Sequence, residues 1–271
     1  MGKFIAVRLF PPARCACAAI AMNAFVYPEW PAPAPVRALT TTRAGGNSTG
    51  SYASFNLADR VGDKAQSVAA NRLQLRTLLP NLPAEPLWLN QVHGSNAVFA
   101  ESALPSAEAD ASICCDERHV CAILSADCLP VLLCDDRGTV VAAAHAGWRG
   151  LVAGVVEATI ARMDVNATHL LAWLGPAIGP QAFEVGEDVR STFVAHDPAA
   201  ASAFVALKPG KWLCDLYLLA RQRLAAAGIN GVYGGNFCTF SEAERFYSYR
   251  RDQQTGRMAT LIWLDRMNPR V

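Results

Sequence analysis

Three residues of types that bind metals or act as nucleophiles stand beside the ends of apolar runs: His93, Cys128 and His145. Imidazole nitrogen and thiolate sulfur together suit Zn²⁺, which keeps three protein ligands and one open position in catalytic sites. Cu²⁺ accepts the same ligands and generally binds them more tightly. Because the separations along the chain match no short-range metal motif, the three residues alone also fit two hydrogen-bonded histidines and a buried cysteine.

The same atoms support a second chemistry, in which Cys128 is a thiolate nucleophile and His145 is its base. Asp127 or Gln91 would then orient the histidine or polarise the substrate. A Cys–His pair needs one histidine, whereas a metal site gains from a second, so His93 discriminates between the two hypotheses.

A third hypothesis is a binding or scaffold protein that keeps zinc for stability. Structural zinc sites are closed by four protein ligands. A fourth ligand such as Cys238 would support this hypothesis, whereas three ligands facing a pocket would argue against it.

Arginines near these residues are candidates for binding an anion. Arg149 lies four residues after His145 at the start of an expected helix, where a guanidinium and a helix N-terminus together attract anions. Arg43 precedes a Gly-rich loop, which also fits a surface hairpin. Aromatic and basic residues cluster at Tyr247, Tyr249, Arg250 and Arg251; such a cluster is usually packing and solvated charge unless it lies beside the site.

Runs of apolar residues predict the elements that position these side chains. Strands are expected at residues 36–42, 87–92, 96–101, 107–115, 120–126, 139–144, 170–174, 232–233 and 258–264. Helices are expected at 63–79, 149–163, 186–194 and 215–227, with Asp63 and Asp215 as N-caps. Strands outnumber helices and the connections are mixed, which predicts an α/β (α+β) domain with mixed, partly antiparallel sheets and flanking helices.

Composition limits the class of protein. With 271 residues, of which 52% are hydrophobic and 17% charged, the chain can bury a large core. A net charge of +1 argues against a dedicated nucleic-acid or membrane-surface protein, and no apolar run reaches the roughly 20 residues that span a bilayer. Nine cysteines without a CxxC pair favour a reducing, cytoplasmic location. We expect residues 1–30 to be a poorly ordered extension and residues 31–271 to be a single domain.

Eight segments in the same order resemble the laccase-domain family, first called multi-copper polyphenol oxidoreductase and now described as purine nucleoside phosphorylase. They are TTRAGGNS, SFNLADRVGD, NQVHGSNAV, SADCLPVLL, AAAHAGWRG, GPAIGPQAFEVG, FCTF and SYRRDQQTGR. The resemblance covers about residues 36–264. It implies a single-domain fold related to cysteine-hydrolase-like toxins. It also implies a zinc ion bound by His93, Cys128 and His145. Gln181 and Ala182 stand where many relatives carry cysteine.

The activity implied by the resemblance is phosphorolysis of adenosine, inosine and methylthioadenosine, with adenosine deamination as a second reaction. The partners would be purine nucleosides and phosphate, and a monomer is favoured. The family is also credited with copper-dependent phenol oxidation and linked to peptidoglycan precursor editing. Five histidines, with His169 and His196 outside the motifs, are too few for several copper ions.

Roles for the remaining candidates follow from the same hypothesis. Arg43, Arg149 and Arg250 would hold phosphate against the ribose carbon. Asp127 and Gln91, which neighbour metal ligands, would orient those ligands or contact the substrate.

Overall fold

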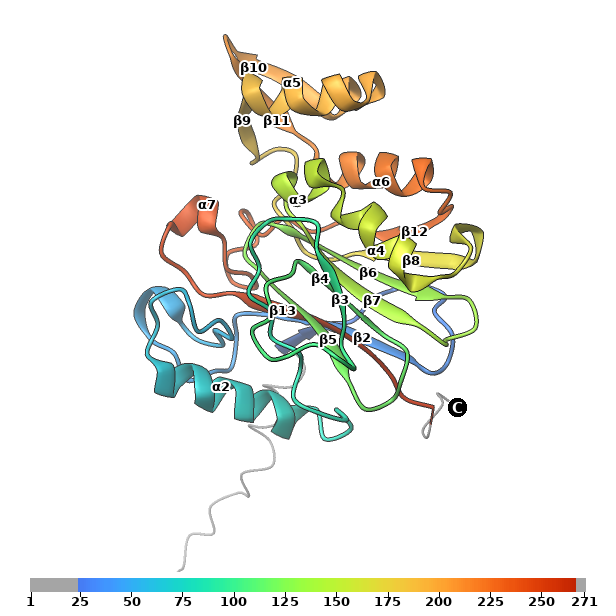
Figure 1. Cartoon of the computed structure of the whole chain (residues 1–271). Helices are drawn as coiled ribbons and strands as arrows, with labels where there is room; N and C mark the ends of the chain where they lie inside the picture. Colours follow the sequence, from blue (N-terminus) through green and yellow to red (C-terminus); the bar gives the residue numbers. More distant parts are fainter. Residues whose placement is uncertain (1–23, 267–271) are drawn as a thin grey trace, which may run out of the picture.

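The computed structural model describes residues 24–266 of the chain, which form two large sheets and one small sheet with flanking helices (Figure 1). The largest sheet has the order β12 (Gly231–Gly234), β8 (Leu170–Leu174), β6 (Leu129–Asp135), β7 (Val141–Ala146), β4 (Ala111–Cys114) and β3 (Ala97–Phe99). The four-stranded sheet has the order β1 (Phe25–Val26), β2 (Val36–Thr41), β13 (Met258–Leu264) and β5 (Val120–Ser125). Parallel and antiparallel pairs both occur in the largest sheet, so the predicted fold class is confirmed.

The two large sheets pack face to face, and helices cover their outer faces. Along β7, Val141 and Ala143 pack between the sheets, while Ala142 and Ala144 face the helices, as alternation along a strand requires. The helices on that side are α3 (Trp148–Ala153), α4 (Val155–Met163) and α6 (Leu216–Ala226). On the opposite side, α2 (Ala65–Leu78) packs on the four-stranded sheet (Figure 1). The two sheets and the helices on their outer faces therefore form four layers.

A small lobe projects from the side of the molecule that carries α3 and α6 (Figure 1). It contains a sheet of order β10 (Phe204–Lys208), β11 (Lys211–Cys214) and β9 (Glu184–Gly186), with α5 (Glu187–His196) beside it. Among the described residues there is one further α-helix, α7 (Tyr249–Asp252), and short 3₁₀ turns lie at Gly50–Tyr52, Ala167–His169 and Pro198–Ala203. None of the three strands of this lobe was expected from the sequence.

Several predicted elements differ from the structure. Residues 87–92 form no strand and contribute only isolated bridges, so that predicted strand is wrong. The helix expected over 149–163 breaks at Gly154, whose φ of 85° is left-handed. Lys64, not Asp63, is the N-cap of α2, and Asp63 accepts a hydrogen bond from Ser48 instead. Asp215 caps α6 as predicted.

The predicted boundary at residue 31 also differs from the structure. Phe25–Val26 pair with β2, so the four-stranded sheet begins within the segment expected to be an extension. Residues 1–23 of that segment lie outside the described residues.

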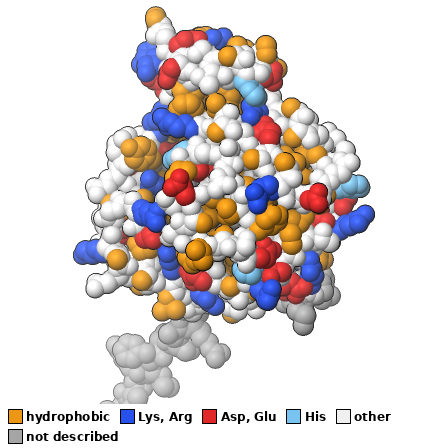
Figure 2. All heavy atoms as spheres, in the orientation of Figure 1, with side chains coloured by type: hydrophobic (Ala, Val, Ile, Leu, Met, Phe, Trp, Pro, Cys, Tyr) orange, Lys and Arg blue, Asp and Glu red, His pale blue; other side chains and the backbone are white. Residues whose placement is uncertain are grey.

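Surface and helix properties bear on the predicted partners. No helix among residues 24–266 combines the length and apolar character needed to cross a lipid bilayer. Figure 2 shows basic and acidic side chains interspersed on one face, without a continuous basic patch. On this face, the charge distribution agrees with the low net charge.

Candidate metal centre

Three segments bring His93, Cys128 and His145 together. His145 lies near the end of β7, Cys128 in the turn between β5 and β6, and His93 in the loop before β3. The His93 Nε2 and Cys128 Sγ atoms are 3.9 Å apart, and the two imidazole rings meet edge to face with centroids 4.8 Å apart. All three ligand atoms lie within 4.8 Å of one another. His145 is buried, Cys128 is half-buried and His93 is exposed, so the cluster is open on one side.

The geometry of this cluster fits zinc. Zn–S and Zn–N bonds of about 2.3 and 2.0 Å at tetrahedral angles place sulfur and nitrogen about 3.5 Å apart, close to the separation between Cys128 and His93. Nδ1 of His145 is engaged with Asp110, which leaves Nε2 as the ligand atom. Cys238, the candidate fourth ligand, accepts a hydrogen bond from the Gly179 N–H and is not part of the cluster. Three ligands with an open side match a catalytic rather than a structural zinc site.

Asp110 contacts two of the candidate ligands and was not predicted from the sequence. Its carboxylate is fully buried and lies 2.9 Å from Nδ1 of His145. It also accepts the backbone N–H groups of Val92, His93 and Gly94 at 3.2, 2.9 and 2.7 Å. These bonds hold His93 at a left-handed φ of 61°. The only sequence signal was an acidic residue just before an apolar run.

Glycine at position 147 lets the loop after β7 approach the sulfur. A Cβ added to Gly147 would lie 2.7 Å from Cys128 Sγ and 3.7 Å from Cδ2 of His93. The first of these distances is too short for a real contact. A side chain at this position would therefore push the thiol out of the cluster.

Charges within the cluster favour the thiolate form of Cys128. Burial alone would raise the pKa of the Cys128 thiol, but the charge of His145 and hydrogen bonds from His145 and His93 outweigh burial and lower it. Burial would lower the pKa of His145, but the Cys128 charge and the Asp110 hydrogen bond raise it. For Asp110, burial is again outweighed, chiefly by the hydrogen bond from His145, and the pKa is lowered. Thiolate is also the form that binds metals.

The cluster lines a cavity of about 630 Å³, within the usual range for small-molecule sites. Four other residues predicted for the site also line this cavity: Gln91, Asp127, Arg149 and Arg250. Apolar and aromatic lining comes from Leu89, Trp148, Ile178, Phe183, Leu216 and Tyr249. The cavity therefore combines a metal-ligand set, cationic groups and aromatic surfaces.

The structure does not bring Arg43 to this cavity. Its guanidinium donates to the carbonyls of Ala53 and Ala243 and lies 4.9 Å from the centre of the Tyr247 ring. The Gly-rich loop that follows Arg43 folds back on it, so this guanidinium secures the loop rather than an anion.

Gln91 and Asp127 are both engaged with the protein. The Gln91 amide donates to the Leu124 carbonyl at 2.9 Å and accepts the Leu124 N–H at 2.8 Å. The Asp127 carboxylate accepts from the Thr239 hydroxyl and the Arg250 N–H, both at 2.6 Å. Each residue therefore ties a loop of the cavity wall to the strand end that carries Cys128.

The pocket arginines differ in how they are held. Arg149 lies over the Trp148 ring, 4.3 Å from its centre, and is otherwise exposed. Arg250 donates from Nη1 to the Glu184 carbonyl at 2.7 Å. Arg60 and Arg257 also line the cavity and were not predicted, although Arg257 ends the SYRRDQQTGR segment.

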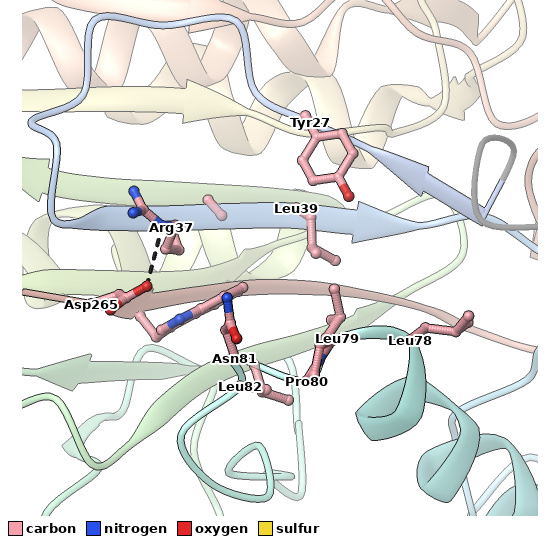
Figure 3. A pocket seen from close by; sticks show the side chains of 11 residues that line it. Tyr27, Arg37, Leu39, Leu78, Leu79, Pro80, Asn81, Leu82 and Asp265 are labelled. Carbon is pink, nitrogen blue, oxygen red and sulfur yellow. Dashed lines mark ion pairs between the residues drawn. The ribbon is translucent and has the colours of Figure 1, made fainter. Parts of the chain in front are cut away.

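A second cavity, of about 180 Å³, lies between the end of α2 and the edge of the four-stranded sheet (Figure 3). Its charged groups, Arg37 and Asp265, form an ion pair at 3.5 Å. Leu39, Leu79 and Leu82 supply apolar lining. With this volume and no metal-ligand set in its lining, it is a weaker candidate for chemistry than the cavity beside Cys128.

Comparisons with known proteins agree over most of the chain. The family described as multi-copper polyphenol oxidoreductase laccase matches residues 37–265. A purine nucleoside phosphorylase from Pseudomonas aeruginosa is 54% identical over 246 residues, covering 90% of this chain and 99% of its own. Another from Escherichia coli is 50% identical over 244 residues, covering 90% and 100%.

Two solved structures are also similar. A Neisseria meningitidis protein aligns with a TM-score of 0.86 and 51% identity, covering 89% of this chain and 99% of its own. YlmD from Geobacillus stearothermophilus aligns with a TM-score of 0.81 and 28% identity, covering 90% and 99%.

Proposed function

The chain belongs to the multi-copper polyphenol oxidoreductase laccase family, and from this premise we propose that it is a zinc-dependent purine nucleoside phosphorylase. The observation that carries the proposal is the three-ligand cluster of His93, Cys128 and His145 on the wall of a cavity lined by arginines and aromatic rings. The names of its relatives from Pseudomonas aeruginosa and Escherichia coli support the same activity. The proposed substrates are adenosine, inosine and methylthioadenosine.

In phosphorolysis, a phosphate oxygen forms a bond to the ribose C1′ while the bond from C1′ to the purine nitrogen breaks. The electron pair leaves with the purine, and the proton of hydrogen phosphate ends on the base, so the products are free purine and ribose 1-phosphate. The cavity arginines supply charge for the phosphate, and Trp148, Phe183 and Tyr249 supply aromatic surfaces for the purine.

Zinc would be held by His93 Nε2, Cys128 Sγ and His145 Nε2, and when bound it supplies a Lewis acid with one open position. Asp110 keeps the proton on Nδ1 of His145, so that Nε2 stays available as a ligand. We extend the proposal to adenosine deamination, because an open zinc position suits hydrolytic attack on a purine ring.

The test is a product assay on metal-quantified protein. Purified protein is incubated with inosine, adenosine and methylthioadenosine, with and without phosphate, and products are identified by mass spectrometry. We expect one zinc per chain and phosphate-dependent release of hypoxanthine from inosine. The His93→Ala variant should lose zinc and activity, whereas His169→Ala, which changes a histidine paired with Asp136 outside the cavity, should keep both. Wild-type hypoxanthine release by folded His93→Ala protein would contradict the proposal.

One arrangement favours a second candidate function, a metal-independent Cys–His hydrolase or amidase acting on a peptidoglycan precursor. Asp110 contacts His145, and His145 contacts Cys128, which is the arrangement of an orienting acid, a base and a nucleophile. The pKa of the Cys128 thiol is also lowered. His93 has no part in this mechanism. Loss of activity with zinc on chelation would exclude it, whereas covalent labelling of Cys128 by an electrophile in metal-loaded protein would favour it.

Copper-dependent phenol oxidation is the least supported alternative. The three-ligand cluster offers one candidate position for a metal ion, and His119 and His169 are paired with Asp116 and Asp136 away from the cavity. The histidines that a multi-copper centre needs are therefore not gathered at this site.

A further inference from the structure

The arginines that line the cavity are Arg60, Arg149, Arg250 and Arg257. Within residues 24–266, none of the four forms an ion pair with a carboxylate, whereas several arginines elsewhere, such as Arg223 with Glu157, do. The acidic side chains that line the same cavity are Asp59, which pairs with Arg72, and Asp127, which accepts two hydrogen bonds. The cavity therefore keeps positive charge that the protein does not neutralise.

Arg257 is the member of this group that the protein holds in place most firmly. Its backbone N–H donates to Asn56 Oδ1 at 2.9 Å, and its Nη1 donates to the carbonyls of Thr255 and Gly256 at 2.8 and 3.0 Å. Its Nε and Nη2 groups have no acceptor among the described residues. A guanidinium fixed through Nη1 presents the two remaining donors in a preset orientation.

The surroundings of Arg257 place it beside the metal centre. The side chain is half-buried and lies 5.8 Å from the centre of the Tyr249 ring. Burial lowers the pKa of Arg257, while the charges of Cys128 and Asp127 act in the opposite direction. The Nε and Nη2 donors of this half-buried guanidinium, which have no acceptor in the described residues, are therefore available to an anion in the cavity.

We propose that Arg257 is the anchor of an oxyanion subsite, where Nε and Nη2 bind two oxygens of inorganic phosphate. Parallel N–H groups of a guanidinium match two oxygens of a tetrahedral anion, which an ammonium group cannot do. The inference rests on the proposed phosphorolysis, in which this phosphate is the attacking group. The subsite itself is defined by Arg257 and is testable without turnover.

The experiment compares Arg257→Met, Arg257→Lys and a matched control, Arg162→Met. Arg162 is exposed, lies 5.1 Å from the centre of the Phe99 ring and does not line the cavity. Two quantities are measured on zinc-loaded protein: the rise in melting temperature caused by inorganic phosphate without nucleoside, and the separate KM values for phosphate and inosine.

For Arg257→Met we expect the phosphate-induced rise in melting temperature to disappear and KM for phosphate to increase roughly 10- to 100-fold, because charge-assisted hydrogen bonds are lost. KM for inosine should change less than about threefold by the same reasoning, since inosine carries no charge for Arg257 to bind. Arg257→Lys should lie between wild type and Arg257→Met, and it also tests the subsite if Arg257→Met does not fold. The control should behave as wild type.

An unchanged KM for phosphate in Arg257→Met, or equal increases in both KM values, would overturn the subsite. If wild-type protein shows no phosphorolysis but phosphate still stabilises it and not Arg257→Met, the subsite stands and the proposed function fails. If wild type is active and Arg257→Met retains its stabilisation by phosphate, the proposed function stands and the subsite fails.

Discussion

The Asp110 carboxylate lies 2.9 Å from Nδ1 of His145 and accepts the backbone N–H of His93 with the same oxygen, also at 2.9 Å. One buried anion thus fixes two candidate metal ligands that come from different segments. It sets the tautomer of one imidazole and the backbone conformation of the other. Such outer-shell carboxylates orient metal-bound histidines and raise their basicity.

Replacing Asp110 should therefore weaken metal binding without touching a ligand. For Asp110→Asn we expect zinc affinity to fall about 10- to 100-fold, because an amide cannot accept from three backbone N–H groups and the imidazole as a carboxylate does. Competition with a chromophoric chelator measures the change. The control is Asp136→Asn, which alters the exposed carboxylate 2.6 Å from Nδ1 of His169. Wild-type affinity in Asp110→Asn would show that Asp110 has no part in holding the ligands.

Gly147 gives a steric prediction at the same centre. In Gly147→Ala, the added Cβ would lie 2.7 Å from Cys128 Sγ, so we expect the thiol to be displaced. The rearrangement that relieves the clash should lower the free energy of unfolding by about 1–3 kcal/mol, as overpacking does. Zinc stoichiometry and thermal unfolding measure the two effects.

Gly94→Ala is the matched control, because its Cβ would meet Asp110 Oδ2 and Val92 at ordinary distances of 3.6 and 3.7 Å. The substitution keeps the Gly94 N–H that Asp110 accepts. If both variants bind zinc like wild type, the close approach at Gly147 is not a constraint on the centre.

The sequence predicted a helix or strand correctly where the signal lies within or next to that element. The apolar runs that became β5, β8 and β13 are continuous, and Asp215 sits just before its helix, so these elements were predictable. β6 was not predicted; it contains Pro130, a residue that is unfavourable in central strands. The helix of the small lobe was predicted, but its strands were missed because β10 and β11 are short and largely exposed, without a buried apolar pattern.

Only part of the candidate site could be predicted, because the sequence shows only local signals. The candidate metal ligands lie at the ends of apolar runs or within motifs, where the residue type alone is enough to select them as candidates. The Asp110 carboxylate contacts His145, which lies 35 residues later in the chain. The Arg43 guanidinium donates to the carbonyl of Ala243, which lies 200 residues later. No sequence pattern indicates such contacts, so Asp110 was overlooked and Arg43 was predicted to belong to a site whose cavity it does not line.

The Asp215 cap makes a prediction about stability. Its side chain accepts the Leu218 N–H at 2.9 Å and satisfies one of the free donors at the start of α6. Asp215→Ala should lower the unfolding free energy by about 0.5–2 kcal/mol, measured by urea denaturation. Asp215→Asn should stay close to wild type, because Asn caps helices about as well as Asp. Equal losses in the two variants would mean that charge, not capping, is the origin of the effect.

The reactivity of Cys128 should reveal the charge distribution of the metal-free centre. Its pKa is lowered to about 6, because the charge of His145 and hydrogen bonds from His145 and His93 outweigh burial. The thiolate is the reactive form, so the rate of alkylation by iodoacetamide should reach half its maximum near pH 6 and nearly its maximum by pH 8. The exposed Cys115 is the internal control, because burial and the charges of Glu101 and Asp116 raise its pKa.

Peptide mapping by mass spectrometry follows both thiols in one sample of chelator-treated protein across a series of pH values. At pH 7 we expect Cys128 to be labelled well before Cys115, and added zinc to protect Cys128 alone. Protection should follow zinc occupancy, since the same sulfur cannot bind metal and react freely. A labelling midpoint for Cys128 near the ordinary thiol value of 9.0, or equal protection of both thiols, would contradict a thiolate poised among His93, His145 and the open side of the cavity.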